Sequence, residues 1–204
     1  MVPLAYRTPK HVQEQKDAKK KHIINSALQV FAQKGFHNTS VQDICKAAGV
    51  SIGSIYFYFP NKESILEAVT DAVADEISAS VTQATESEND LRELIGKGIR
   101  GLFSALNANP SIAPFLRANS YIAEMKQKRD DILQLSTSGF TQILDAVVRK
   151  GMIQPLNLEL ASIVITNAVY SLVRYRNINE GHVEIDEIAD FLTAFIVRGL
   201  GFDG

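Results

Sequence analysis

The sequence of 204 residues has a single cysteine, no tryptophan and no long apolar segment. One cysteine, Cys45, excludes a disulfide within the chain and is typical of a protein in the reducing cytoplasm. We interpret it as a small apolar side chain, with a redox switch as the alternative. The longest mostly apolar run, residues 160–173, is shorter than the roughly 20 residues that cross a bilayer. No apolar run follows the charged N-terminal residues, so a signal peptide is not indicated. We expect a cytoplasmic protein with no membrane partner.

The sequence also lacks the patterns of catalytic and metal sites. The four histidines are scattered, and there is no HExxH motif, no paired-cysteine spacing and no glycine-lysine phosphate loop. Adjacent acidic pairs such as Asp130-Asp131 do not share a helix face, so they indicate solvated surface. We therefore predict a protein that is not an enzyme and that uses no cofactor or metal.

Charge is divided unevenly along the chain. Residues 1–62 carry nine Lys or Arg against three acidic residues, a net charge of +6, whereas the remainder carries twelve against twenty, a net charge of −8. A basic part attracts phosphates and an acidic part is repelled by them, so this division favours nucleic acid as the partner of residues 1–62. Lys19, Lys20 and Lys21 are either a solvated helix face or phosphate contacts, and the motif that follows them favours phosphate contact.

Residues 23–69 have the pattern of short helices joined by glycine turns. Apolar residues at helical spacing indicate a first helix, which Gly35 can end because glycine adopts a left-handed backbone at a helix C-terminus. Thr39 and Gln42 have the spacing of a capping box for a second helix. Gly49 permits the turn that follows, and Ser51 can cap a third helix. A helix, a tight glycine turn and a short exposed helix form a layout that fits the major groove of DNA.

This segment resembles the tetracycline-repressor-like (TetR) family of transcriptional regulators. The matching residues cover about a quarter of the chain and are Ile23-Ile24, Phe31-Ala32-Gln33-Lys34-Gly35-Phe36, Thr39-Ser40-Val41, Asp43-Ile44, Ala47-Ala48-Gly49-Val50-Ser51, Gly53-Ser54-Ile55-Tyr56, Tyr58-Phe59 and Lys62-Glu63. The joint pattern is highly specific, and Cys45 is its one departure, where the family usually has a small alanine. The resemblance implies a homodimeric, DNA-binding regulator, in particular a repressor.

The resemblance also implies roles for individual residues. The residues expected to face base edges or the adjacent backbone are Gln42, Ser51, Ile52, Gly53 and Ser54. Phosphates are expected to contact Thr39, Ser40, Tyr56, Tyr58 and Lys62. Ile55 and Phe59 are interpreted as core, and Phe57 as either core or surface. Because the third helix has few charged side chains, we expect its specificity to depend partly on apolar contacts and on DNA shape.

We predict an all-α fold of about nine helices. Residues 1–15 are predicted to form a flexible basic arm, residues 16–62 a three-helix helix-turn-helix head, and residues 63–204 a helical ligand-binding and dimerisation domain. Beyond the head, apolar periodicity indicates a long helix that Asn61 can cap, then helices over about 91–106, between residues 110 and 114, and over about 120–150, 158–176 and 185–196.

Three glycines, Gly96, Gly98 and Gly101, interrupt the predicted fifth helix. Each costs about 1 kcal/mol relative to alanine in a helix interior. Close packing against another helix is the simpler explanation. Close approach of a ligand, or a bend, is the alternative.

The last two predicted helices are unusually apolar. The eighth is apolar around much of its circumference and the ninth on one broad face, as is typical of helices covered on two sides. The resemblance implies that both join their twins in a four-helix dimer interface, and burial in the chain's own core is the alternative. The predicted interface residues are Ile163, Asn167, Val169, Phe191 and Phe195.

The resemblance further implies a small effector that binds in the second domain. It would change the separation of two reading helices, which must match half-sites about 34–36 Å apart. The candidate lining residues are Phe103, Phe115, Tyr121, Met125, Phe140 and Tyr170, with Arg117 or Arg174 as anchors for an anionic group. These side chains favour a largely apolar ligand. The alternatives are a DNA-binding regulator controlled by a protein partner, and an enzyme or carrier on the same fold.

Overall fold

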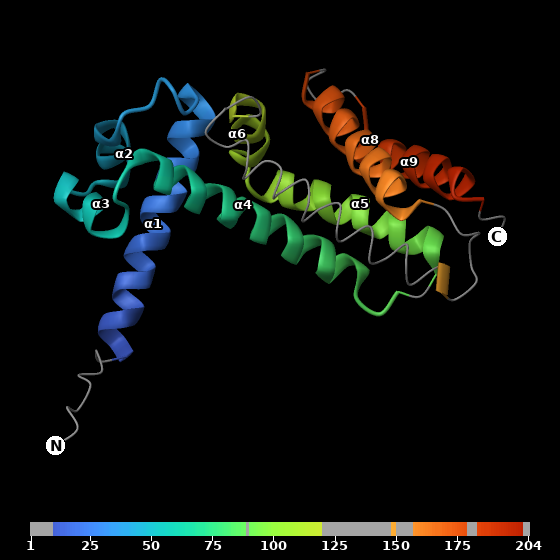
Figure 1. Ribbon diagram of the computed structural model, residues 1–204, viewed down its shortest axis with the longest axis horizontal. Coiled ribbons are helices and arrows are strands. Elements are labelled where there is room, and N and C mark those ends of the chain that lie inside the picture. Colours follow the sequence, from blue (N-terminus) through green and yellow to red (C-terminus); the bar gives the residue numbers. More distant parts are fainter. Residues whose placement is uncertain (1–9, 89, 120–147, 150–156, 179–182, 202–204) are drawn as a thin grey trace. The chain divides into compact units, whose positions relative to one another are not determined.

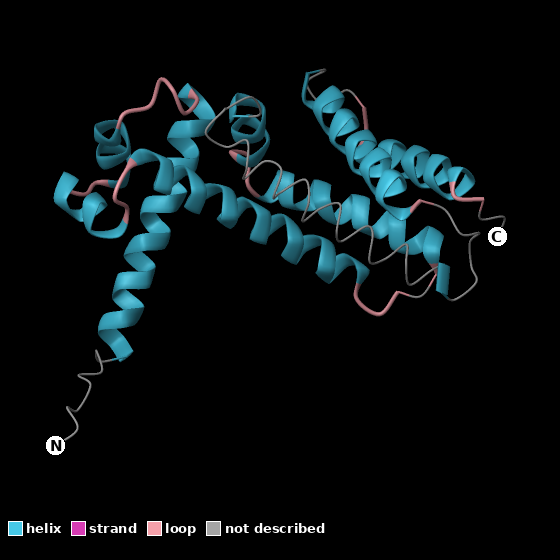
Figure 2. Cartoon of the chain, viewed as in Figure 1, coloured by secondary structure: helices cyan, strands magenta, loops and turns pink. Residues whose placement is uncertain are grey.

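The computed structural model describes residues 10–88, 90–119, 148–149, 157–178 and 183–201, and every regular element in these residues is an α-helix (Figure 1, Figure 2). In chain order the helices are α1 (Lys10–Lys34), α2 (Val41–Ala48), α3 (Ile52–Tyr58), α4 (Lys62–Thr85), α5 (Leu91–Ala108), α6 (Ile112–Asn119), α8 (Leu158–Ile178) and α9 (Ile185–Gly199). The predicted all-α fold is confirmed. The helix predicted over residues 120–150 lies outside the described residues, except that residues 148 and 149 are helical. None of the described helices is long and apolar enough to cross a membrane.

The chain divides into two compact units, and the division falls inside α4. The first unit comprises Met1–Ala72 with Pro114–Asn119, and the second unit comprises Val73–Ala113 with Ser120–Gly204. The predicted boundary at residue 62 coincides instead with the start of α4. Because α1 begins at Lys10, residues 10–15 of the predicted flexible arm are helical.

The first unit is built on α1, against which α2 packs, while α3 packs on α2. Its interior includes the fully buried side chains of Ile23, Phe31, Ile44 and Ile55. Burial of one such side chain contributes about 1.5–3 kcal/mol to folding. The core positions predicted for Ile55 and Phe59 are confirmed.

Glycines end the first two helices, as predicted. Gly35 follows α1 with φ of 72°, and Gly49 follows α2 with φ of 61°, both in the left-handed region that side chains with a Cβ disfavour. The next N–H, that of Val50, donates to the carbonyl of Cys45 at 3.1 Å, which satisfies one of the last carbonyls of α2. This turn sends the chain directly into α3.

In the second unit, α5 packs along α9, and α8 also packs on α9. Within this unit, α4 and α5 are in tight contact at Gly101. A Cβ built there would lie 2.9 Å from both the Ser80 carbonyl oxygen and the Ala84 Cβ. The Ser80 Oγ donates to the Gly101 carbonyl at 2.8 Å. Close helix packing therefore explains this glycine of the predicted fifth helix.

Arg100 links α5 to α9. Its Nε donates to Asp186 at 3.0 Å and its Nη2 to Asp190 at 2.7 Å, so one guanidinium bridges two carboxylates one turn apart on α9. The hydrogen bond to Asp186 raises the pKa of Arg100. Gly96 leaves room for this link, because a Cβ there would lie 3.0 Å from Arg100 Nη1 and 3.3 Å from Thr193 Oγ1.

Candidate nucleic-acid interface

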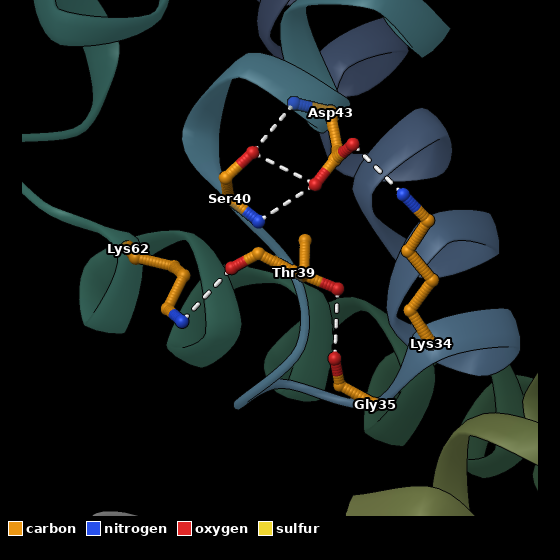
Figure 3. A network of polar contacts seen from close by, with 6 residues as sticks. All are labelled: Lys34, Gly35, Thr39, Ser40, Asp43 and Lys62. Atoms are coloured by element: carbon orange, nitrogen blue, oxygen red, sulfur yellow. Dashed lines mark hydrogen bonds and ion pairs between the residues drawn. The ribbon is translucent and has the colours of Figure 1, made fainter.

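The helix that precedes the glycine turn is capped by Ser40 and Asp43 (Figure 3). The Ser40 Oγ accepts the N–H of Asp43 at 3.1 Å, and the Asp43 Oδ2 accepts the N–H of Ser40 at 2.9 Å. This is a reciprocal capping box, in which two backbone donors at the start of α2 gain side-chain acceptors. The predicted box of Thr39 and Gln42 is therefore wrong by one residue.

Thr39 lies inside the first unit rather than on its surface. Its side chain is only 3% exposed, and its Oγ1 donates to the Gly35 carbonyl at 2.7 Å. Figure 3 shows this hydroxyl directed at the end of α1. The burial contradicts the predicted phosphate contact by the Thr39 hydroxyl.

Asp43 joins the cap of α2 to α1. Its Oδ1 accepts a hydrogen bond from the Lys34 ammonium at 2.8 Å. This contact, followed by the hydrogen bonds from the Ser40 N–H and hydroxyl, holds the pKa of Asp43 well below its usual range. An ionised carboxylate in the first turn is also favoured by the dipole of α2. Gln42, beside it in the same turn, is exposed, as a base-reading residue must be.

The third helix presents small and apolar side chains to solvent. Ser51 caps it by accepting the N–H of Ser54 at 3.2 Å, which confirms the predicted cap. Ser51, Ile52 and Gly53 are all exposed, and Ser54 is half-buried. A Cβ at Gly53 would meet only the Ser51 Oγ, at 4.0 Å, so the space in front of this backbone is open. This surface of α3 permits the edge of a base to approach closely. Contact with bases stays a prediction.

Aromatic residues fill the rest of α3. Tyr56 is 51% exposed and Phe57 is 68% exposed, whereas Tyr58 is half-buried with its ring edge against Phe57, 4.9 Å between centroids. Phe57 is thus a surface residue. No residue of α3 carries a charge, so any electrostatic attraction to phosphates must come from neighbouring helices.

Lys62, at the start of α4, is held inside the first unit. Its ammonium donates to the carbonyls of Phe36 at 2.8 Å and Thr39 at 2.9 Å, and it lies 4.2 Å from the centroid of the Phe36 ring. Figure 3 shows the side chain reaching the segment between α1 and α2. Lys62 therefore connects α4 to that segment through hydrogen bonds. The sequence did not indicate this role. Its predicted phosphate contact stays a prediction, and one N–H of the ammonium remains for it.

The residues predicted to line an effector site are only partly described. Phe103 is buried in the second unit and Phe115 in the first unit, each 1% exposed. The side chains of Arg117, Tyr170 and Arg174, and all of Tyr121, Met125 and Phe140, lie outside the described residues. An effector site at these residues stays a prediction.

Most of the predicted interface residues are on the surface of the second unit. Ile163, Phe191 and Phe195 are 41%, 60% and 58% exposed, and the two phenyl rings stack with centroids 6.1 Å apart. Asn167 is exposed as well, and its amide donates to the Ile163 carbonyl at 2.8 Å. Val169, by contrast, is 6% exposed. It is buried within the chain, and its predicted place at the dimer interface stays a prediction.

An apolar groove lies on the same two helices. It has a volume of about 300 Å³ and is lined by residues that include Leu160, Val164 and Phe195. Leu160 and Val164 are 59% and 61% exposed, and neither is one of the five residues named above as the predicted interface. Their spacing of four on α8 was the available signal. The groove extends the exposed apolar surface across α8 and α9.

In the described parts of the chain, no three His, Cys, Asp or Glu side chains gather where they could hold a metal ion.

Comparison with known proteins relates the chain to bacterial regulators. Residues 23–69 match the family described as "Bacterial regulatory proteins, tetR family". The chain is 27% identical over 194 residues to the fatty acid metabolism regulator protein of Bacillus subtilis, covering 92% of this chain and 98% of that protein. It is 23% identical over 193 residues to the HTH-type transcriptional repressor KstR2 of Rhodococcus jostii, covering 91% and 92%. The crystal structure of FadR from Bacillus subtilis in complex with stearoyl-CoA matches with a TM-score of 0.79 and 26% identity, over 88% of this chain and 98% of that one.

Proposed function

The chain belongs to the tetR family of bacterial regulatory proteins, and on that premise we propose that it is a cytoplasmic transcriptional repressor, released from its operator DNA by a small, largely apolar effector. One observation carries the DNA-binding part of this proposal. After the Gly49 turn, α3 exposes Ile52, Gly53 and Tyr56 within residues 1–62, whose net charge is +6. A short helix that is exposed in this way fits a major groove.

Each exposed residue has a proposed role at the operator. Gln42 bonds an adenine edge, and Ile52 contacts a thymine methyl group. Gly53 and Ser51 let the backbone approach the DNA, and Tyr56 donates its hydroxyl to a phosphate. Tyr56→Phe then removes only that hydroxyl and weakens binding to all sequences alike, whereas Ile52→Ala changes the preferred sequence.

We propose that two copies associate through α8 and α9. The support is the exposed apolar surface that includes Leu160, Val164 and Phe195, together with the groove that it lines. Monomeric proteins rarely leave such a patch in water. A second copy is the occupant we favour, because one α3 of seven residues reads only one half-site.

For the effector, we propose a long acyl chain carried by an anionic head group. The aromatic residues predicted to line the second domain favour an apolar ligand, and the Bacillus subtilis regulator with 26% identity was solved with stearoyl-CoA. A ligand shifts DNA binding only through its differential affinity for the two states, which typically corresponds to about 5–150-fold in operator affinity.

Fluorescence anisotropy with a duplex taken from upstream of its own gene tests this function. We expect tighter binding to this duplex than to one of the same length and shuffled sequence. We also expect stearoyl-CoA to weaken specific binding by about 5–150-fold, while coenzyme A alone leaves it unchanged.

The outcomes separate the parts of the proposal. Failure to bind any duplex at low salt overturns the DNA-binding role. Specific binding that stearoyl-CoA leaves unchanged, although calorimetry shows that this ligand binds the protein, overturns the effector mechanism.

A further inference from the structure

The first helix extends well beyond the core that it supports. The buried residues of α1 begin at Ile23, so Lys10–His22, roughly 20 Å of helix, precede them. This segment carries five lysines and two acidic residues. Because none of the buried residues of α1 lies in this extension, core packing does not explain its length.

One face of this extension lies against α3. The ammonium of Lys16 is 5.8 Å from the centroid of the Phe57 ring, and that of Lys20 is 5.8 Å from the centroid of the Phe59 ring. The ammonium of Lys19 donates to the Ser54 Oγ at 3.3 Å. Lys16, Lys19 and Lys20 are spaced by three and four residues, so they share one side of α1. We call this set the lysine face.

The two acidic residues of the extension have partners outside the lysine face. At about 100° per residue, Glu14 lies about 160° around α1 from Lys16, whereas Asp17 lies about 60° from Lys20. Glu14 pairs with Lys10 at 3.7 Å, and Asp17 accepts a hydrogen bond from Gln13 at 2.9 Å. Within the part of the chain that the structure describes, no acidic side chain pairs with the lysine face.

The lysine face therefore supplies the charge that α3 lacks. The third helix is uncharged from Ile52 to Tyr58, yet binding to DNA depends heavily on neutralised phosphates. Three ammonium groups on long side chains lie beside α3 or its C-cap. Aromatic rings under two of them keep those groups near the helix without neutralising them.

We propose that Lys16, Lys19 and Lys20 form a second DNA-binding surface, which contacts the phosphate backbone beside the groove that α3 enters. This inference rests on the proposed DNA-binding function. Because phosphates carry no sequence information, the surface strengthens binding to every duplex equally. Lys21 lies about 140° around α1 from Lys16 and is exposed on the other side, so it is not part of this surface.

The test measures how DNA affinity depends on salt, using a fluorescent duplex of mixed sequence. We compare the wild type with the variant Lys16→Gln/Lys19→Gln/Lys20→Gln and with the matched control Lys21→Gln. The slope of log affinity against log salt falls by about 0.9 for each phosphate that the protein no longer neutralises. We expect a smaller slope for the triple variant, an unchanged slope for Lys21→Gln, and a restored slope when the three lysines become arginines.

Thermal unfolding separates DNA binding from packing. If the three lysines only pack on aromatic rings, the triple variant unfolds at a lower temperature and keeps the wild-type salt slope, which overturns the inference. The inference is also overturned if the salt slope falls by the same amount per lysine removed in the triple variant and in Lys21→Gln. If the triple variant does not fold, Lys19→Gln alone against Lys21→Gln makes the same comparison. A wild type that binds no duplex at low salt instead refutes the proposed function itself.

Discussion

Gly98 and Gly101 lie three residues apart on α5, and replacing each by alanine is expected to change stability in opposite directions. Both replacements gain about 1 kcal/mol of helix propensity. They differ in what the new methyl group meets. At Gly98 it would lie 3.6 Å from the Thr85 Cγ2, an ordinary contact. At Gly101 it would lie 2.9 Å from the Ser80 carbonyl oxygen, which belongs to the backbone of α4 and cannot move aside alone.

The size of each effect follows from these distances. Gly98→Ala is expected to raise the free energy of unfolding by up to about 1 kcal/mol. Overpacking of a tight site costs about 1–3 kcal/mol. Gly101→Ala also disturbs the hydrogen bond from Ser80 to the Gly101 carbonyl. We expect its net effect to be a decrease of about 1–2 kcal/mol in the free energy of unfolding.

Urea unfolding followed by circular dichroism measures both changes. The two variants and the wild type are compared at one protein concentration, because association alters apparent stability. Gly98→Ala is the matched control, since it makes the same chemical change on the same helix. If both variants were more stable than the wild type, the tight approach of α4 and α5 would not exist in solution.

Three further results are expected. Lys62→Met should lower the free energy of unfolding by about 1–3 kcal/mol, because two carbonyls lose their charged donor; a stability equal to the wild type would leave Lys62 only its phosphate role. The depressed pKa of Asp43 implies stability that is fully present above the usual aspartate pKa of about 3.9 and is lost as the pH falls further toward the folded-state pKa. Asp43→Asn should therefore flatten the acid limb of a pH–stability curve, and an unchanged limb would contradict that coupling. Phe195→Glu should yield a folded monomer by sedimentation, whereas Val169→Glu, at a buried position, should reduce folding itself; a dimeric Phe195→Glu protein would exclude this interface.

The capping of α2 shows that sequence spacing predicts a capping box but does not decide which residues form it. Thr39 with Gln42 and Ser40 with Asp43 both have the spacing of a capping box. The choice between them depends on contacts that spacing does not contain. Thr39 is buried against the carbonyl of Gly35, whereas Asp43 gains the Lys34 ammonium, so the second pair caps the helix.

The helix types, the two glycine turns and the exposure of the third helix were predictable, because each depends on local backbone preferences or on apolar periodicity. Contacts between distant residues were not. Lys62 reads as an exposed lysine in the sequence, yet its ammonium lies between two carbonyls. The glycines of α5 stood out as anomalies, but only the position of Ser80 on α4 explains Gly101.

The absence of charge on α3 has a consequence for how such a protein can acquire new targets. If the lysine face provides the grip on phosphates, substitutions at Ile52 or Gly53 alter which bases are preferred while the electrostatic attraction to DNA persists. Each intermediate in a series of such substitutions would still bind DNA while its preferred sequence drifted. Sequence preference and general affinity for DNA would then depend on different helices. The product of a duplicated gene could therefore change its operator sequence while it continued to bind DNA.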